Sequence, residues 1–316
     1  MRELIKDKKW AYIISIFCTF LWGSAFPTVK LTYRELGIQA GDTSEMILVA
    51  GIRFFLAGLL VVFIMSFLDK KNLHQLKTNF PYLLKLGLIV VTFGYLFFYV
   101  ATGNTSGMKS ALISSSSTFF VVIFSHYLLG EEFTKYKLIA ILFGILGIII
   151  TNVDKGFDFN FTIKGEGFML INSILGALST IYVKKHGKGI SPFASSAGQF
   201  LYGGFLLMVI GFILSNRVMD FTFLSVVLII YAALISSVAF SLWYIILQEY
   251  KASEIAFLRL FIPFFGTFLS ALVLGESLNP YIILGLILVI IGIVIINKTS
   301  DAKVRGTIIR GEDVNR

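Results

Sequence analysis

The sequence has little of the chemistry that enzymes and metal sites require. It contains one cysteine, Cys18, and three histidines among 316 residues. A single cysteine excludes an intramolecular disulfide, and no Cys/His cluster has the spacing of a metal site. The chain also lacks a G-x-x-x-x-G-K-[ST] loop, a nucleophile elbow and an H-E-x-x-H motif. We therefore expect a protein that is not an enzyme and that uses no cofactor or metal.

Charged residues are also scarce. They make up 14% of the chain, whereas hydrophobic residues make up 57%, including 32 Phe. The mean hydropathy of +0.86 is far from that of a soluble domain and predicts a polytopic membrane protein whose partner is the lipid bilayer. The net charge of +9 does not indicate nucleic-acid binding, because the basic residues do not gather on one face with aromatic side chains between them.

Apolar runs recur along most of the chain. Each is close to the roughly 20 residues that a helix needs to cross a bilayer. Lipid cannot satisfy backbone N–H and C=O groups, and the runs lack the alternation of a barrel strand, so helices are expected. The sequence predicts an all-α integral membrane protein with ten transmembrane helices. They fall near residues 10–29, 46–68, 82–101, 110–129, 136–152, 167–183, 194–214, 224–247, 254–274 and 281–296.

The chain consists of two copies of one unit. The stretch from Leu129 to Asn152 occurs again from Leu274 to Asn297 at a constant shift of 145 positions, and matching residues continue upstream to Tyr99 and Tyr244. Each copy holds five predicted spans, so the two copies must cross the membrane in opposite senses. The sequence therefore predicts two inverted five-helix repeats, an arrangement that supports alternating access.

Lysine and arginine residues in the connections predict the orientation. With the N-terminus inside, the cytoplasmic connections carry 19 of these residues and the outer connections carry 6. The positive-inside rule then places both termini in the cytoplasm, in a multi-pass protein of the cytoplasmic (inner) membrane. The expected segments are a cytoplasmic N-terminus at 1–9, a first repeat at 10–152, an external linker at 153–166, a second repeat at 167–297 and a cytoplasmic tail at 298–316.

Acidic residues are absent from the deep part of every predicted span. A proton relay at the bilayer midplane would ordinarily need one. Glu131 and Glu276, which are repeat equivalents, instead stand at helix ends. We expect each of them to orient its helix end and to cap the helix that follows it.

Polar side chains at helical spacing indicate which helix faces avoid lipid. In the fourth span this face includes Ser114 and Thr118, and the repeat equivalent of Ser114 in the ninth span is Arg259. An arginine within a span costs about 2.5 to 3.5 kcal/mol on insertion scales, so it needs compensation. We favour a cavity in which Arg259 holds a substrate carboxylate or another anion. The alternative is a side chain that snorkels to the headgroups.

Aromatic and amide side chains share the direction of these polar faces. Trp22, Tyr99 and Tyr244 are candidates to enclose the apolar part of a substrate, and packing is the alternative role for each. Arg53 in the second span, whose repeat equivalent is Gln199, is expected to tie helix ends together. The candidate substrate-binding residues are Arg259, Ser114, Thr118, Trp22, Tyr99, Tyr244 and Gln199.

The fifth and tenth predicted spans have almost no internal polarity. Their small residues suit close helix contact. We assign these two helices to the scaffold, or to a homodimer that forms through helices five and ten. The packing glycines are Gly144, Gly147, Gly285 and Gly292.

Short motifs occur in a fixed order along the chain. The first span holds Phe20 to Phe26 (FLWGSAF), the second contains Arg53-Phe54, and Leu-Gly-Glu closes the fourth and ninth spans. Over about residues 10–297 the chain resembles the EamA-type transporters of the drug/metabolite transporter superfamily. The resemblance implies a ten-helix fold with a cavity formed by helices one to four and six to nine, while helices five and ten lie outside it.

The resemblance also implies a function, because members of that family mostly export amino acids and related metabolites. One departure is Thr118, where many relatives carry proline, whereas Pro263 keeps it in the ninth span. We therefore expect a helix break in the ninth span only.

These observations together favour a secondary transporter. It would export amino acids or related small metabolites through the cytoplasmic membrane by alternating access, with a small-molecule substrate as its partner. One alternative is efflux of multiple drugs or hydrophobic cations from an aromatic-rich cavity, although Arg259 would repel a cation. The other is a membrane scaffold or sensor that does not transport.

Overall fold

The protein is all-helical throughout its described residues, which in this computed structural model are 5–151, 161–215, 219–277, 280–281, 283–288, 290–292 and 295. The helices are α2 (Lys8–Glu35), α3 (Thr43–Leu68), η1 (Lys70–Asn72), α4 (Gln75–Thr78), α5 (Phe80–Gly87), η2 (Leu88–Tyr95), α6 (Leu96–Asn104), α7 (Gly107–Ser114), α8 (Ser117–Leu129), α9 (Lys135–Thr151), η3 (Ile163–Gly167), α10 (Phe168–His186), α11 (Pro192–Leu214), α12 (Phe223–Glu249), α13 (Ala252–Ala256), η4 (Phe257–Leu260) and α14 (Phe261–Leu274).

Eight helical stretches are long and apolar enough to cross a membrane. Large apolar side chains cover their outer surface, such as Phe63 at 64% exposure and Phe223 at 87%. A surface of this kind is stable in lipid and not in water. The prediction of an integral membrane protein is therefore confirmed. The eight stretches are Lys8–Glu35, Thr43–Leu68, Phe80–Asn104, Gly107–Leu129, Ile163–His186, Pro192–Leu214, Phe223–Glu249 and Ala252–Leu274.

The second helices of the two copies, α3 and α11, pack closely along their length. Glycines bring their backbones together, since a Cβ atom at Gly51 would lie 2.2 Å from the Met208 backbone nitrogen. A Cβ atom at Gly211 would likewise lie 2.4 Å from the Leu48 nitrogen. Small residues at such positions allow the van der Waals contact that holds helices together in lipid.

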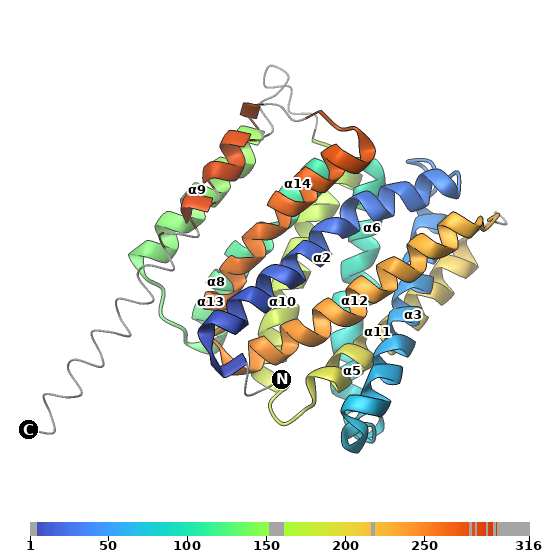
Figure 1. Cartoon of the computed structure of the whole chain (residues 1–316), viewed down its shortest axis with the longest axis horizontal. Coiled ribbons are helices and arrows are strands. Elements are labelled where there is room, and N and C mark those ends of the chain that lie inside the picture. The colour runs from blue at the N-terminus through green and yellow to red at the C-terminus, as the bar shows by residue number, and fades with distance from the viewer. Residues whose placement is uncertain are drawn as a thin grey trace, which may run out of the picture.

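The first helix of each copy packs against helices of the other copy. In Figure 1, α2 lies between α12 and α14, which are its main contacts. The corresponding helix of the second copy, α10, packs against α8, η2 and α6. α2 therefore packs with helices of the second copy and α10 with helices of the first. Neither group of packed helices corresponds to one half of the sequence.

Two equivalent helices are interrupted at equivalent places. The fourth predicted span breaks at Ser115 and Ser116, between α7 and α8, and the ninth contains the 3₁₀ segment η4 between α13 and α14. The hydroxyls of Ser114, Ser115 and Ser116 each donate to the carbonyl three residues earlier, at 2.8, 2.6 and 2.7 Å. Such local bonds compete with the regular helix ladder. The expectation of a break in the ninth span only is therefore wrong, because serines disturb the fourth span without a proline.

Two carboxylates join the ends of these broken helices. Glu131 accepts hydrogen bonds from the backbone N–H groups of Ala252 at 2.9 Å and Ser253 at 3.0 Å, at the start of α13. Glu276 accepts from Gly107 and Met108, both at 3.2 Å, at the start of α7. Each carboxylate thus satisfies free N–H groups at a helix N-terminus.

The prediction that Glu131 caps the helix that follows it is wrong, because Glu131 instead caps α13. Glu276 caps α7, and the start of the helix that follows it lies outside the described residues. Gly130 and Gly275 precede them with φ of 68° and 69°, a left-handed conformation that ends the helix and turns the chain. Each carboxylate then reaches the broken helix of the other copy. Because α8 ends where α13 begins and α14 ends where α7 begins, the two broken helices lie side by side and antiparallel.

The fifth predicted span, α9, lies beside the described helical residues 283–288 and 290–292 of the tenth (Figure 1). A Cβ atom at Gly292 would lie 3.1 Å from the carbonyl oxygen of Ala140, and one at Gly144 would overlap the ring of Phe119. Gly147 and Gly285 are buried as well. These glycines therefore serve contacts within the chain, and the homodimer stays a prediction.

Parts of the expected domain organisation fall outside the described residues. These are residues 1–4 of the N-terminal segment, 153–160 of the linker between the copies and the tail at 298–316. The described part of the linker contains most of η3, whose Glu166 accepts hydrogen bonds from Thr105 and Thr162.

Replacing Glu131 with Gln should destabilise the protein. The variant keeps the shape of the side chain but loses the charge that pairs with the start of α13, which should cost about 1–2 kcal/mol. The melting temperature of the detergent-purified protein should fall by several degrees, whereas Glu249→Gln, a change at an exposed glutamate, should leave it unchanged. Equal melting temperatures for all three proteins would contradict the capping role.

Candidate functional site

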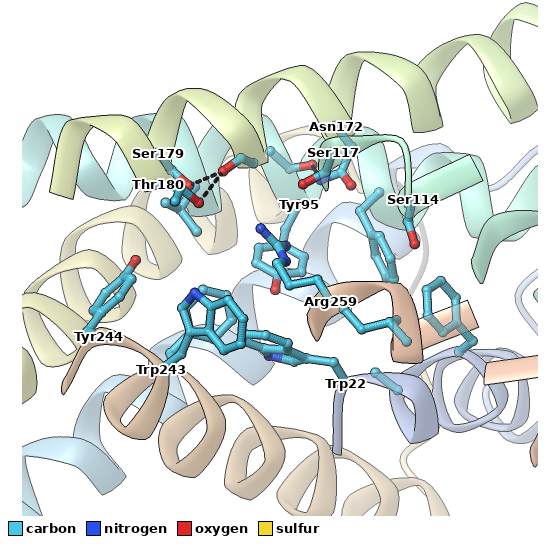
Figure 2. Close-up of a pocket in the computed structure, with 18 of the residues that line it drawn as sticks. Trp22, Tyr95, Ser114, Ser117, Asn172, Ser179, Thr180, Trp243, Tyr244 and Arg259 are labelled. Atoms are coloured by element: carbon cyan, nitrogen blue, oxygen red, sulfur yellow. Dashed lines mark hydrogen bonds between the residues drawn. The ribbon is translucent and has the colours of Figure 1, made fainter. Parts of the chain in front are cut away.

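A cavity of about 100 Å³ lies between the helices of both copies (Figure 2). Its walls come from α2, α3, η2, α6, α7, α8, α10, α12, η4 and α14. The cavity is lined by two arginines, Arg53 and Arg259, and among its described lining residues none is Asp or Glu. The cavity is therefore a positively charged compartment inside an apolar bundle.

Arg259 projects from η4 into this cavity. Its guanidinium carbon lies 5.4 Å from the ring centre of Trp22 and 5.9 Å from that of Trp243 (Figure 2). Within the described residues, no hydrogen bond or ion pair involves its guanidinium. Aromatic faces attract a cation without using its N–H groups, so these donors stay available to a ligand. Arg259 therefore lines the cavity, and its role as a substrate-binding residue stays a prediction.

The aromatic residues around Arg259 hold one another edge to face. The rings of Trp22 and Trp243 are 5.1 Å apart, and those of Trp22 and Phe240 are 5.2 Å apart. The indole nitrogen of Trp22 is buried and has no hydrogen-bond partner in the described structure. The aromatic rings thus pack together on one side of the cavity, and the indole N–H of Trp22 is a donor without a partner among the described residues.

The opposite wall is polar and comes mainly from α10 and the start of α8 (Figure 2). The Ser117 side chain is 4% exposed, and its oxygen has no hydrogen-bond partner among the described residues. Ser179 and Thr180 both donate to the carbonyl of Gly176. This wall offers oxygen atoms and amides that face the guanidinium across the cavity.

The third predicted span contains a π-helical segment, η2, beside the cavity. A wider helical turn of this kind displaces backbone groups from the regular ladder and is frequent at functional sites. Asn172 of α10 donates from Nδ2 to the carbonyl of Gly94 in this segment, at 2.9 Å. Asn172 thereby fixes the π-helical segment against α10, and both residues line the cavity.

The second arginine, Arg53, is held by three hydrogen bonds to the protein. It donates to the Ala232 carbonyl at 3.1 Å, the Tyr99 hydroxyl at 2.9 Å and the Ser236 hydroxyl at 3.0 Å. It therefore ties α3 to α6 and α12, a structural role like the one the sequence suggested. At the equivalent place in the second copy, Tyr244 donates to Gln199 Oε1 at 2.7 Å.

Four of the seven predicted site residues line the cavity: Trp22, Ser114, Tyr244 and Arg259. The other three do not. Tyr99 bonds to Arg53, Gln199 accepts from Tyr244, and the Thr118 hydroxyl donates to the Ala256 carbonyl at 3.1 Å. All three are at most 1% exposed, so they support the site and do not face a ligand.

Sequence reasoning left several lining residues out of the predicted set. Ser117, Asn172 and Thr180 were visible as polar positions in their spans, but runs of serine and isolated amides are also common packing residues. Trp243 and Tyr95 were two aromatic residues among many. Only the burial of Ser117 without a partner, and the contact of Trp243 with Arg259, separate these residues from packing.

The comparison with known families agrees with this architecture. The model of the EamA-like transporter family matches residues 9–153 and again residues 163–298. The chain belongs to the EamA-like transporter family. The two matched segments correspond to the two copies described above.

Several proteins of similar sequence are named as transporters or efflux pumps. The chain is 24% identical over 296 residues to the uncharacterized transporter YoaV of Bacillus subtilis, covering 89% of this chain and 94% of the relative. It is 26% identical over 309 residues to the uncharacterized transporter YvbV of the same organism, covering 96% of each. A probable amino-acid metabolite efflux pump of Salmonella typhimurium is 20% identical over 298 residues, covering 89% of this chain and 93% of the pump.

A solved crystal structure has the same fold. It matches with a TM-score of 0.73 at 14% sequence identity and covers 91% of this chain and 96% of its own. At this identity the likeness concerns the fold alone.

The two arginines should respond differently to replacement by lysine. Arg53→Lys should destabilise the protein by about 2–4 kcal/mol, because one ammonium cannot reach the three acceptors that the guanidinium fork holds. Arg259→Lys should change stability by less than about 1 kcal/mol, since only contacts with aromatic rings are altered. Thermal unfolding of both purified variants tests this, and an equal loss of stability would contradict the assignment.

Proposed function

We propose that this transporter is a secondary exporter of small metabolites such as amino acids and related organic acids, and that Arg259 binds the negative charge of its substrate. The observation that carries the proposal is a guanidinium in a cavity, held by Trp22 and Trp243 and without a protein carboxylate. A planar guanidinium can bind a carboxylate through two parallel hydrogen bonds. Ser114 and Tyr244 line the same cavity and supply polar contacts.

The mechanism we propose is alternating access by two inverted repeats of five helices each. Two observations support it. The equivalent broken helices, α7–α8 and α13–α14, run antiparallel and are joined at both ends by Glu131 and Glu276. Their interruptions lie next to Ser114 and Arg259, so bending at these points changes access to the cavity. Helices with a break at the substrate site are a common feature of transporters.

The proposed location is the cytoplasmic membrane with both termini inside, on the strength of the lysine and arginine distribution. No catalytic activity is proposed. Efflux of hydrophobic cations is not retained as a second function, because the described lining carries arginine and no carboxylate, which repels cations.

Replacing Arg259 with Gln should weaken substrate binding on the order of tenfold to a hundredfold, since a charge-assisted pair is lost. The measurement is a thermal-shift screen of purified protein against amino acids and related organic acids, followed by counterflow in liposomes. Lys251→Gln, a change at an exposed cation, is the matched control. Equal uptake by wild type and Arg259→Gln would remove Arg259 from the site, and binding without exchange would indicate a sensor.

Cysteine labelling tests the topology. In a Cys18→Ala background, a cysteine in place of exposed Gln39 should react with a membrane-impermeant maleimide in intact cells. A cysteine in place of exposed Lys188 should react only after the cells are permeabilised. The reverse pattern would place both termini outside, and labelling of both from outside would contradict the inverted repeat.

A further inference from the structure

We infer that the cargo is a small organic monoanion, a carboxylate whose second polar group is an uncharged hydroxyl or carbonyl, and that the membrane potential drives it outward. This inference rests on the proposed transport function and narrows the class of substrate. It excludes the zwitterionic amino acids that the proposal as a whole admits.

The charges around the cavity favour a net negative ligand. Arg53 and Arg259 both line it, and its described lining holds no carboxylate. An amino acid would bring an ammonium group into this compartment together with its carboxylate. Like charges in a desolvated site repel, and no lining carboxylate offsets the repulsion.

Aromatic faces can also bind an ammonium group in place of a carboxylate. The two tryptophan faces of the cavity, those of Trp22 and Trp243, already contact the guanidinium of Arg259. A second cation at the tryptophans would have to share the same faces with Arg259. The guanidinium of Arg259 is therefore the cation of this site, and the ligand contributes the negative charge.

The wall opposite Arg259 suits an uncharged polar group. The Ser117 oxygen is buried without a partner, and a hydroxyl both donates and accepts. Asn172 uses Nδ2 to hold Gly94, and no described hydrogen bond uses its Oδ1, which is free to accept from a ligand hydroxyl. Leaving such buried groups unpaired is unfavourable, so a ligand that pairs with them is preferred.

The size of the cavity restricts the ligand further. Its volume of about 100 Å³ is smaller than the roughly 150 Å³ of an engineered cavity that admits benzene. A cavity of this size favours a small acid over a large one. Glycolate and lactate are such acids, and glycine and alanine are their amino counterparts of nearly equal shape.

The same charge argument predicts how transport is driven. Among the described lining residues no Asp, Glu or His can carry a proton with the cargo. A monoanion that crosses alone moves one charge, and a membrane that is negative inside pushes it outward. At equilibrium its concentration ratio should change tenfold for about 59 mV.

Binding can be measured with the tryptophans of the site. The chain has three, and Trp10→Phe leaves only Trp22 and Trp243. Tryptophan fluorescence of the purified variant should then respond to glycolate and L-lactate with at least tenfold higher affinity than to glycine and L-alanine. Amino acids that bind as tightly as their hydroxy counterparts, or a panel in which neither kind binds, would overturn the inference.

A substitution at Ser117 separates its hydroxyl from the charge. Ser117→Ala should weaken glycolate binding about fivefold while leaving acetate, which lacks the second polar group, unchanged. Arg259→Gln should weaken both acids. An equal effect of Ser117→Ala on acetate and glycolate would contradict the assigned role of Ser117.

Transport in liposomes completes the test. Vesicles containing the full-length protein are loaded with radiolabelled L-lactate or L-alanine, and the potential is set with potassium and valinomycin. Lactate should leave faster when the interior is negative and should reach a tenfold ratio at about 59 mV. Arg259-dependent alanine exchange that ignores the potential would overturn this inference while sustaining the proposed function. No exchange of either compound would count against both.

Discussion

Placing a guanidinium inside a bilayer is costly, and this bundle meets that constraint in two different ways. Arg53 donates to Ala232, Tyr99 and Ser236, so its charge is stabilised by hydrogen bonds that join three helices. Arg259 is stabilised by tryptophan faces and keeps its donors free. The same residue type therefore builds the scaffold in one place and the proposed ligand site in the other.

The duplication explains why both arrangements occur in one cavity. Arg53 and Gln199 occupy equivalent positions, and each bonds to the equivalent tyrosine, Tyr99 or Tyr244. The glutamate caps follow the same rule, because each copy closes the start of the broken helix in the other. The two copies thus share the same helix contacts but differ in the side chains that line the cavity. Ser114 of the first copy, for example, occupies the position of Arg259 in the second.

Hydropathy and the repeat were enough to predict the eight observed spans, because both depend only on which residues lipid tolerates. Arg259 was found for the same reason. Two of the three misplaced site residues, Tyr99 and Thr118, lie close to a place where the regular helical period fails. Tyr95, at the end of the π-helical η2, lines the cavity, whereas Tyr99 in α6 bonds to Arg53. Thr118, just after the break at Ser115 and Ser116, donates to Ala256. Contacts between the copies, including the glutamate caps, leave no local pattern in a sequence.

The first helix of each copy packs against helices of the other copy, and this arrangement affects the order in which the chain can assemble during synthesis. The segment α2 leaves the ribosome before the others, yet its main contacts, α12 and α14, are near the end of the chain. During synthesis α2 is therefore inserted before the helices that make most of its contacts, and its Ser15 and Thr19 are buried in the complete bundle. Assembly of the bundle is complete only when residues 223–274 have been inserted. The N-terminal copy alone therefore lacks the main contacts of its own first helix.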